Sequence, residues 1–376
     1  MHPLQNTDLV KIIVSFQAGW PQALVGILRH LREVSNTIRI GEVWLGLTAP
    51  CLAEAMPVDL HLLQQVHTRL PGAITRDVFD YLAASGQLLA IIFLHTHHYT
   101  CSKWALNAAA EAGHLGVVRF LHDHRSEGCS THAMDYAARN GHLDVVEFLH
   151  RHRAEGCSSF ALTAACARGH LGVVRFLHRH RHEGCTSHAM DSAAENGHLE
   201  IVRLLHFERH EGCSRVALEY AAKYGHLDIV RFLHTHRREG RLADALRNAA
   251  AQGHAAVVAY LLPFVPVLAP EAMDYAARNG ALDTVQLLHA TGRASCSKRA
   301  LTWAAMAGQA DVVCFLLRYR TEGDVEEAHA MAERMQMTSV ARLLRPFVTS
   351  ARNIRIADVD YIGFTMCEKR PQFLVA

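Results

Sequence analysis

The sequence predicts an all-α protein built from repeated pairs of helices, and three observations predict it. Glycines recur along the chain with a step of 27 or 28 residues. Around most of these glycines the same residues return, with two alanines before the glycine and a Val-Val pair after it. Alternating Val/Ile/Thr runs with hairpin turns are absent from the periodic region. The periodic glycines are Gly86, Gly113, Gly141, Gly169, Gly197, Gly225, Gly253, Gly280 and Gly308. A constant period of this length is typical of a solenoid.

Each repeat is expected to begin with a short helix of about eight residues that starts at a hydroxyl side chain. Ser158 follows a Gly-Cys pair and stands where an N-cap is needed. The same position is held by Ser102, Ser130, Thr186, Ser214 and Ser297. An Ala-Ala pair such as Ala137-Ala138 lets neighbouring backbones approach closely. Gly141 then ends the helix, because glycine adopts the left-handed C′ conformation at no steric cost.

A second helix is expected from about His142 to Arg153. Its apolar residues form a stripe wide enough to pack on helices of two adjacent repeats, and its charged residues face solvent. The stripe consists of Leu143, Val145, Val146, Phe148 and Leu149. Acidic residues at the start and basic residues at the end of this helix suit its dipole.

The periodic region is expected to span residues 50–346, with about nine clear repeats and two degenerate capping repeats. Degenerate copies lie at residues 58–67 and 328–344, where Gln336 takes the glycine position. Terminal copies are atypical because they cover a neighbour on one side and meet water on the other. Residues 1–49 are expected to form an N-terminal helical cap, and residues 347–376 a C-terminal tail without repeats.

The recurring string Ala-Ala-x-x-Gly-His-Leu-x-Val-Val-x-Phe/Leu-Leu, as at residues 137–149, resembles the ankyrin repeat. The usual ankyrin unit has 33 residues. It opens with Thr-Pro-Leu-His, whereas the aligned residues here read His132-Ala-Met-Asp135. The loop of the shorter repeat leaves too little chain for a projecting β-hairpin, so these hairpins are expected to be lacking or vestigial. The chain resembles the short-period variety found in large ankyrin-repeat families of protists. The resemblance implies an ankyrin-like helix-turn-helix solenoid that binds a partner protein.

Composition argues against several other classes of protein. Lys and Arg number 38 and Asp and Glu 36, so there is no basic excess for binding nucleic acid. The longest apolar run, residues 257–269, is interrupted by Pro263 and Pro266 and is shorter than the ~20 residues of a membrane span. The N-terminus has no signal-peptide pattern, so we expect reduced cysteines and a cytoplasmic or nuclear location. Hydrolase and nucleotide-binding motifs are absent, so no catalytic residue, cofactor or small-molecule substrate is expected. We expect a monomer.

Histidine is unusually abundant, with 28 residues that fall at fixed positions of the repeat. One series follows the glycine, as in His142; a second ends the second helix, as in His150; a third lies two residues later, as in His152. Zinc binding with the nearby cysteines is one interpretation, but residues i and i+2 point to opposite sides of a helix, so structural or solvated histidines are favoured. The ankyrin resemblance implies that the first series ties the turn between the helices. Protonation of the later series is expected to weaken stacking in acid.

Cysteines of adjacent repeats, ~8–10 Å apart, are too distant for disulfides.

Partner-binding residues are expected where the repeats differ from one another. The two residues before each glycine vary freely, as do the residues that open the first helix. In ankyrin proteins similar positions line the concave face. The candidates are Trp104, Arg139, Asn140, Phe160, Arg168, Glu195, Asn196, Lys223, Tyr224, Arg278 and Asn279. Trp104 and Phe160 are candidate aromatic anchors.

The expected function is therefore a non-enzymatic scaffold that binds a partner protein through its concave face and loop edge. The alternative is a substrate-recognition adaptor of a ubiquitin ligase, since residues 1–49 are faintly similar to an F-box.

Overall fold

The structure is a computed structural model that describes residues 60–69, 71–209, 211–292, 294 and 296–349. Within these residues it contains 21 α-helices and no strand, which confirms the all-α prediction and the lack of β-hairpins. The chain divides into two compact units, unit 1 ending at Cys185 and unit 2 beginning at Thr186. None of the described helices has the length and hydrophobicity of a bilayer-spanning segment.

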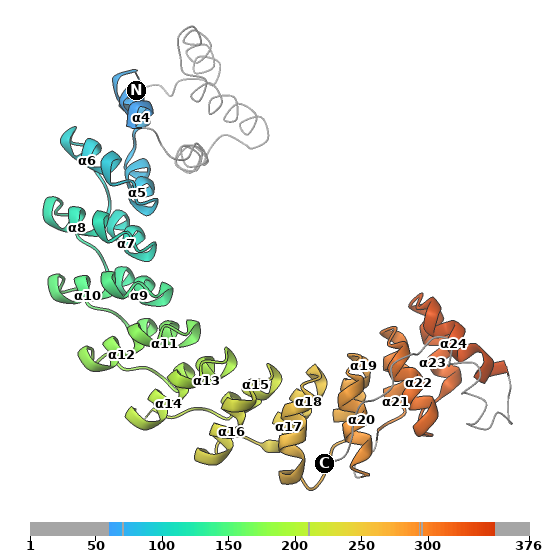
Figure 1. Cartoon of the computed structure of the whole chain (residues 1–376). Coiled ribbons are helices and arrows are strands. Elements are labelled where there is room, and N and C mark those ends of the chain that lie inside the picture. The colour runs from blue at the N-terminus through green and yellow to red at the C-terminus, as the bar shows by residue number, and fades with distance from the viewer. Residues whose placement is uncertain (1–59, 70, 210, 293, 295, 350–376) are drawn as a thin grey trace, which may run out of the picture. The chain divides into compact units, whose positions relative to one another are not determined.

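Unit 1 consists of helical pairs in two rows, which Figure 1 shows side by side. The first helices of its repeats are α5 (Arg76–Ala84), α7 (Lys103–Glu111), α9 (Thr131–Asn140) and α11 (Ser159–Arg168). The second helices are α6 (Leu88–Thr96), α8 (Leu115–His124), α10 (Leu143–His152) and α12 (Leu171–His180), preceded by α4 (Leu60–Arg69) and the 3-10 turn η1 (Pro71–Ala73). Each first helix contacts the next one, and the second helices do the same. The row of first helices lies on the inner side of the curve that unit 1 makes in Figure 1.

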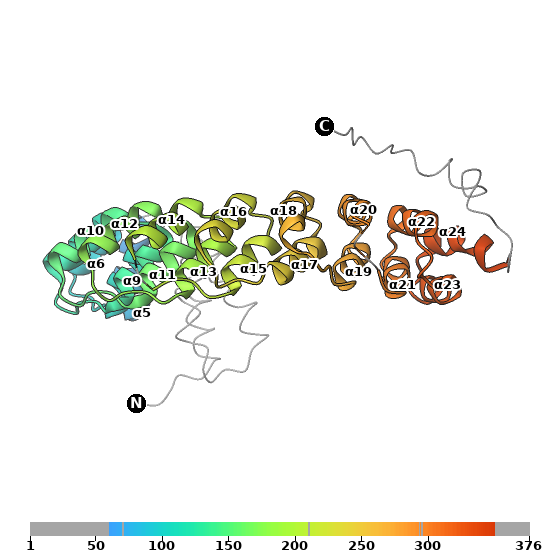
Figure 2. The same cartoon turned by 90° about the horizontal axis from the view of Figure 1, so that it is seen from below.

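Unit 2 repeats the same plan in two layers, and Figure 2 shows α20 and α22 above α19 and α21. Its first helices are α13 (His188–Glu195), α15 (Val216–Lys223), α17 (Leu242–Gln252), α19 (Glu271–Arg278), α21 (Arg299–Met306) and α23 (Val325–Arg334). Its second helices are α14 (Leu199–Glu208), α16 (Leu227–His236), α18 (Ala255–Leu261), α20 (Leu282–Ala290), α22 (Ala310–Tyr319) and α24 (Thr338–Thr349), with the 3-10 turn η2 (Leu262–Phe264) after α18.

The helix ends follow from glycine and the residue after it. Gly141 has φ 83°, and the amide of His142 donates to the carbonyl of Ala137 at 3.0 Å, which satisfies a free carbonyl at the end of α9. Gln336, predicted to take the glycine position, has φ 60° and is one of two non-glycine residues with positive φ among those described. The backbone therefore repeats this turn even where the glycine is lost.

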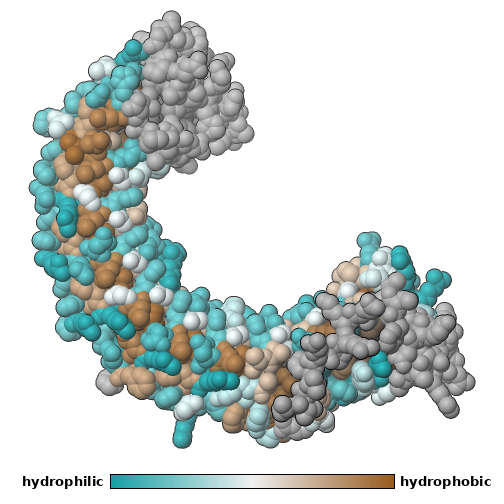
Figure 3. Space-filling model, viewed as in Figure 1, coloured by the Kyte–Doolittle hydropathy of each residue, from teal (hydrophilic) through white to brown (hydrophobic). Residues whose placement is uncertain are grey.

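The predicted second helix is confirmed to within one residue at each end. The prediction ran from His142 to Arg153, whereas α10 spans Leu143–His152. His142 has φ −81° and ψ 75°, and Arg153 is extended, so both flank the helix. The predicted core is confirmed for the Ala137-Ala138 pair and for Val145, which are fully buried. The surface of unit 1 also has a repeating pattern: Figure 3 shows hydrophobic patches that recur along it between hydrophilic side chains.

The hydroxyl caps are confirmed at four of the six predicted positions. Ser102, Ser158, Ser214 and Ser297 accept from the amide two residues ahead, at 3.0–3.2 Å. Ser130 is the N-cap residue of α9 as predicted, but its hydroxyl makes no bond to a backbone amide of the helix: it accepts from the side-chain Nδ2 of Asn107 at 3.0 Å and lies 3.0 Å from His132 Nδ1. Thr186 stands at the same place relative to its helix as Ser214, and its carbonyl accepts from the amide of Ala189 at 3.0 Å, but its hydroxyl makes no cap bond within the described residues.

The chain ends remain largely predictions. The helical cap at residues 1–49 and its F-box resemblance lie outside the described residues, and so does residue 350 onward of the predicted tail. Helix α24 continues to Thr349, so the last helix extends three residues into the predicted tail.

Candidate functional site

An aromatic row lies on the first helices of unit 1 and consists of Trp104, His132, Tyr136 and Phe160. The rings of Trp104 and His132 are stacked at 6.1 Å, those of His132 and Tyr136 are stacked at 5.5 Å, and Phe160 meets Tyr136 edge-on at 6.1 Å. Trp104 is 54% exposed and Phe160 46% exposed. The row therefore presents rings from three successive repeats to solvent.

The 28-residue period of the repeat and the spacing within α9 explain why these rings meet. Trp104, His132 and Phe160 hold the same position of three repeats, 28 residues apart. Tyr136 lies four residues after His132 on α9, so the two side chains share one face of that helix. The opposite face of α9 is buried through alanines such as Ala133. Small buried residues thus hold the three helices close together while the rings stay outside.

Positively charged side chains border the aromatic row. The guanidinium of Arg139 lies 5.9 Å from the centre of the Tyr136 ring, within range of a cation–π contact. Arg168 is exposed at the end of α11 and donates to Asn140 Oδ1 at 3.0 Å. Asn140 in turn donates to the carbonyl of Glu111 at 2.7 Å. Asn140 and Arg168 therefore both connect neighbouring repeats, while Arg139 lies against the aromatic row.

The predicted residues of unit 2 form smaller groups. The Lys223 ammonium lies 5.0 Å from the Tyr224 ring centre and 5.9 Å from that of Tyr220. The Arg278 guanidinium lies 5.9 Å from the ring centre of Trp303.

Of the other three predicted residues of unit 2, two have side chains bonded to the backbone, and Glu195 is contacted at its main-chain carbonyl. Asn279 donates to the carbonyl of Ala251 at 2.6 Å, and Asn196 to that of Ser192 at 2.8 Å. The carbonyl of Glu195 lies 3.0 Å from Nε2 of His226. The structure therefore groups Lys223 with Tyr224 and gives the asparagines a structural contact.

Tyr136 was missed by the sequence-based prediction, as were Tyr275 and Trp303, whose rings lie 5.5 Å apart in unit 2. All three stand five residues before a periodic glycine, where Tyr81 and Tyr220 also lie and the other four repeats have alanine, serine or asparagine. Variation at this position is the signal that could have identified them. His132 lies among the residues that open the first helix and differ between repeats, but it was not included among the predicted partner-binding residues.

In several repeats a buried carboxylate joins the repeat to the start of the next, and the sequence-based prediction did not include it. Asp274 accepts from the amide of Ser297 at 2.9 Å and from its hydroxyl at 2.6 Å. Asp135 and Ser158 make the same two bonds at 2.7 and 2.8 Å. Burial raises the pKa of Asp274 above its ordinary value, and hydrogen bonds from Ser297 oppose the shift. These pairs set the register between repeats.

The histidine that follows each glycine packs against the previous repeat. A Cβ placed on Gly141 would lie 2.5 Å from Nδ1 of His170. In unit 2, Nε2 of His254 lies 2.8 Å from the carbonyl of Lys223. The imidazole therefore fills the space that the glycine leaves open, which is a structural role.

The second histidine series stacks against the next repeat. His150 meets Phe176 edge-on at 5.4 Å and lies 5.5 Å from the ring of His180. The pKa of His150 is lowered below its ordinary value, chiefly by burial. The positive charges of Arg181, His180 and Arg151 lower it further, and the negative charge of Glu183 opposes the shift. The pKa values of His95, His206 and His289 are lowered in the same way, chiefly by burial.

These histidines predict a loss of stability in acid. Because their pKa values lie below the 6.5 of an unfolded chain, the native state binds fewer protons than the unfolded state as the pH falls through that range. The thermal midpoint is therefore expected to fall between pH 7.5 and 5.5, and His150→Gln should reduce the fall. A midpoint that does not change with pH, measured by circular dichroism, would contradict this prediction.

The cysteines beside the loops are poor metal ligands. Burial raises the pKa of Cys129 and of its equivalents Cys101, Cys157, Cys213 and Cys296 to about 11, so they remain thiols near neutral pH. None of the eight cysteines that the structure describes is in a disulfide bond. No group of three or more metal-ligating side chains occurs in the part of the chain that the structure describes.

Two family models match parts of the chain, and a search of solved structures gave a weak similarity. A family model described as "Ankyrin repeats (3 copies)" matches residues 136–215 and 190–267, and one described as "Ankyrin repeats (many copies)" matches residues 106–150. A crystal structure of the human ASB11 ankyrin repeat domain is 21% identical, with a TM-score of 0.32. That match covers 56% of this chain and 96% of the other. The comparison with curated proteins found no match.

Proposed function

Because the chain belongs to the ankyrin-repeat family, we propose that it is a non-enzymatic scaffold that binds a partner protein through the aromatic row of unit 1. Ankyrin repeats are generally protein–protein interaction modules. The exposure of the aromatic row carries the proposal. The Tyr136 position holds alanine in the flanking repeats, at Ala108 and Ala164, so packing of the repeat does not require a large ring there.

The physical character of the row supports this function. Tryptophan and tyrosine supply large contact area at protein interfaces with little loss of side-chain freedom, and both are enriched among residues that dominate binding energy. Ring contacts between adjacent repeats hold Trp104 and Phe160 in place before a partner arrives. Arg139 and Arg168 add polar, positively charged contacts at the edge, as expected of an interface rim.

A double variant tests the proposal. Full-length protein carrying Trp104→Ser and Phe160→Ser is expected to bind a partner captured by the native protein at least about tenfold more weakly, because each ring would lose its buried contact area. Partners are captured from the native cell, identified by mass spectrometry, and their dissociation constants are measured with purified protein.

The matched control is Phe207→Ser, which removes an aromatic ring 67% exposed on the second helix α14. This variant should bind like the native protein. Equal binding by the double variant and the native chain would refute the aromatic row as the binding surface. Loss of binding only after deletion of residues 1–49 would assign the interaction to that segment.

A further inference from the structure

One loop of unit 2, residues 237–242, lacks the Cys-Ser pair that ends the loop in several other repeats. The repeat before it reads Arg-x-Glu-Gly-Cys-Ser at residues 209–214, whereas here Arg241 and Leu242 replace the Cys-Ser pair. Gly212 has φ 74°, but Gly240 lies outside the left-handed region. A Cβ on Gly240 would lie 2.6 Å from the side chain of Leu218, so this loop runs directly over α15.

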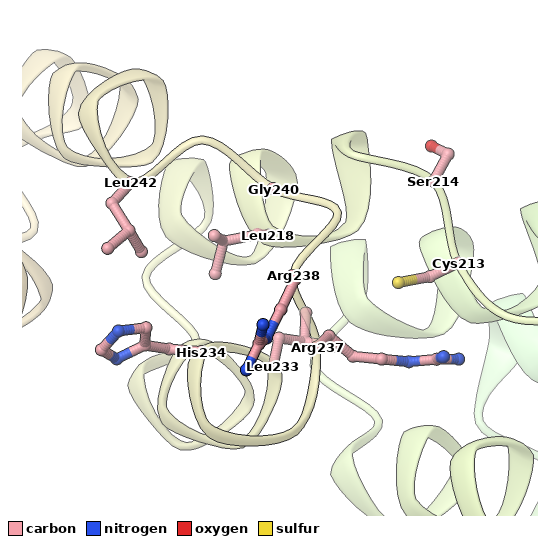
Figure 4. A pocket seen from close by; sticks show the side chains of 9 residues that line it. All are labelled: Cys213, Ser214, Leu218, Leu233, His234, Arg237, Arg238, Gly240 and Leu242. Atoms are coloured by element: carbon pink, nitrogen blue, oxygen red, sulfur yellow. The ribbon is translucent and has the colours of Figure 1, made fainter.

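A cavity of about 250 Å³ opens beside this loop. Its apolar wall is formed by Leu218, Leu233 and Leu242, and its polar wall includes His234 and Arg238. Figure 4 shows Leu218 below Gly240, with Leu242 and His234 on one side and the Arg238 guanidinium beside Leu233. Arg237 extends the other way, toward Cys213. The volume is sufficient for one apolar side chain of moderate size.

The loop beside the cavity carries an excess of positive charge. Residues 237–241 contain three arginines and one glutamate. Arg237 is engaged, with Nη1 3.5 Å from Glu239 and Nη2 3.7 Å from the sulfur of Met190. Arg238 and Arg241 are exposed and form no ion pair with a described residue. Five other loops balance one arginine with one glutamate, in the pairs Arg125–Glu127, Arg153–Glu155, Arg181–Glu183, Arg209–Glu211 and Arg320–Glu322.

We propose that this cavity binds a short acidic segment of a partner protein. One apolar side chain of the segment enters between the leucines, and flanking carboxylates pair with Arg238 and Arg241. Charge complementarity selects carboxylates for the rim, and the apolar wall selects a hydrophobic residue for the interior. A nucleic acid would need a basic track over several repeats, and the neighbouring loops are neutral. The inference rests on the proposed function, since it names the chemistry of a second contact on the loop edge.

Fluorescence anisotropy of the full-length protein with labelled pentapeptides tests the inference. The peptide Asp-Glu-Leu-Asp-Glu is expected to bind, and its affinity should fall as salt rises. Asn-Gln-Leu-Asn-Gln, which lacks the charges, and Asp-Glu-Gly-Asp-Glu, which lacks the apolar side chain, should each bind at least about tenfold more weakly.

Two variants test whether the peptide binds in the cavity. Arg238→Glu reverses a rim charge, and Leu242→Asp puts a carboxylate into the apolar wall at the first residue of α17, where the helix dipole favours an acid. Each should weaken binding of Asp-Glu-Leu-Asp-Glu at least about tenfold. Arg179→Glu makes the same charge change as Arg238→Glu at an exposed position of α12 and should leave binding unchanged.

Several outcomes would overturn the inference. They are no binding of Asp-Glu-Leu-Asp-Glu to the native chain, equal binding of the three peptides, or equal binding by native protein and the Arg238→Glu variant. Tighter binding of a single-stranded oligonucleotide that is lost in Arg238→Glu would assign the basic loop to nucleic acid instead. Failure here, with partner capture still dependent on Trp104 and Phe160, would reject the cavity and leave the proposed function intact.

Discussion

Replacing Gly141 with alanine is expected to lower the free energy of unfolding by about 3 kcal/mol. Two costs combine at this residue. Gly141 has φ 83°, which an L-residue rarely adopts. The added Cβ would also lie 2.5 Å from the His170 ring, so the imidazole must leave its place between the repeats. Urea unfolding followed by circular dichroism measures the loss, and hydrogen exchange of the amides in α9 to α12 places it in unit 1.

Two further variants separate these costs. Gly292 has φ 64°, but a Cβ added there would have no atom within 4 Å apart from its neighbours in the chain, so Gly292→Ala should cost only about 1 kcal/mol from the backbone. The double variant Gly141→Ala/His170→Ala should recover part of the loss relative to the sum of the single variants. If Gly141→Ala and Gly292→Ala cost the same, the histidine contact does not contribute to the requirement for glycine.

Asp274→Ala is expected to cost about 2–3 kcal/mol, because it leaves the amide and the hydroxyl of Ser297 without their acceptor in a buried site. Asp274→Asn should cost much less. Asn107 already holds the equivalent position in unit 1 and accepts from the Ser130 amide at 3.1 Å. Because burial raises the pKa of Asp274, the native carboxyl gains its proton at higher pH than the unfolded one, and its contribution to stability decreases as the pH rises through that range.

The same urea unfolding measurement checks this prediction, with Asp283→Ala as the control. Asp283 is an exposed aspartate in the first turn of α20, where its removal should cost at most about 0.5 kcal/mol of dipole energy. Equal losses for Asp274→Ala and Asp283→Ala would show that the bonds to Ser297 do not stabilise the array. A large loss for Asp274→Asn would show that the bonds need a charged acceptor.

Part of the candidate site could be predicted from the sequence. Trp104 and Phe160 were identified because they vary while the core residues of the repeat do not, and both are exposed in the structure. Asn140 was identified on the same ground but also bonds to the preceding repeat. Variation along one chain shows that a residue is not needed in every repeat. It does not show whether the side chain faces solvent or a neighbouring backbone, because that depends on contacts across the stack.

The sequence by itself determined the period, the helical pairs and the glycine turns, because each of these depends on residues close together in the chain. The tertiary structure decided which side chains meet between repeats. The bond from Ser158 to Asp135 spans 23 residues and the contact between His254 and Lys223 spans 31. The cavity beside Gly240 likewise exists only where one loop runs over the helix beneath it. Such contacts depend on how one repeat is placed on the next, and local propensity does not fix that placement.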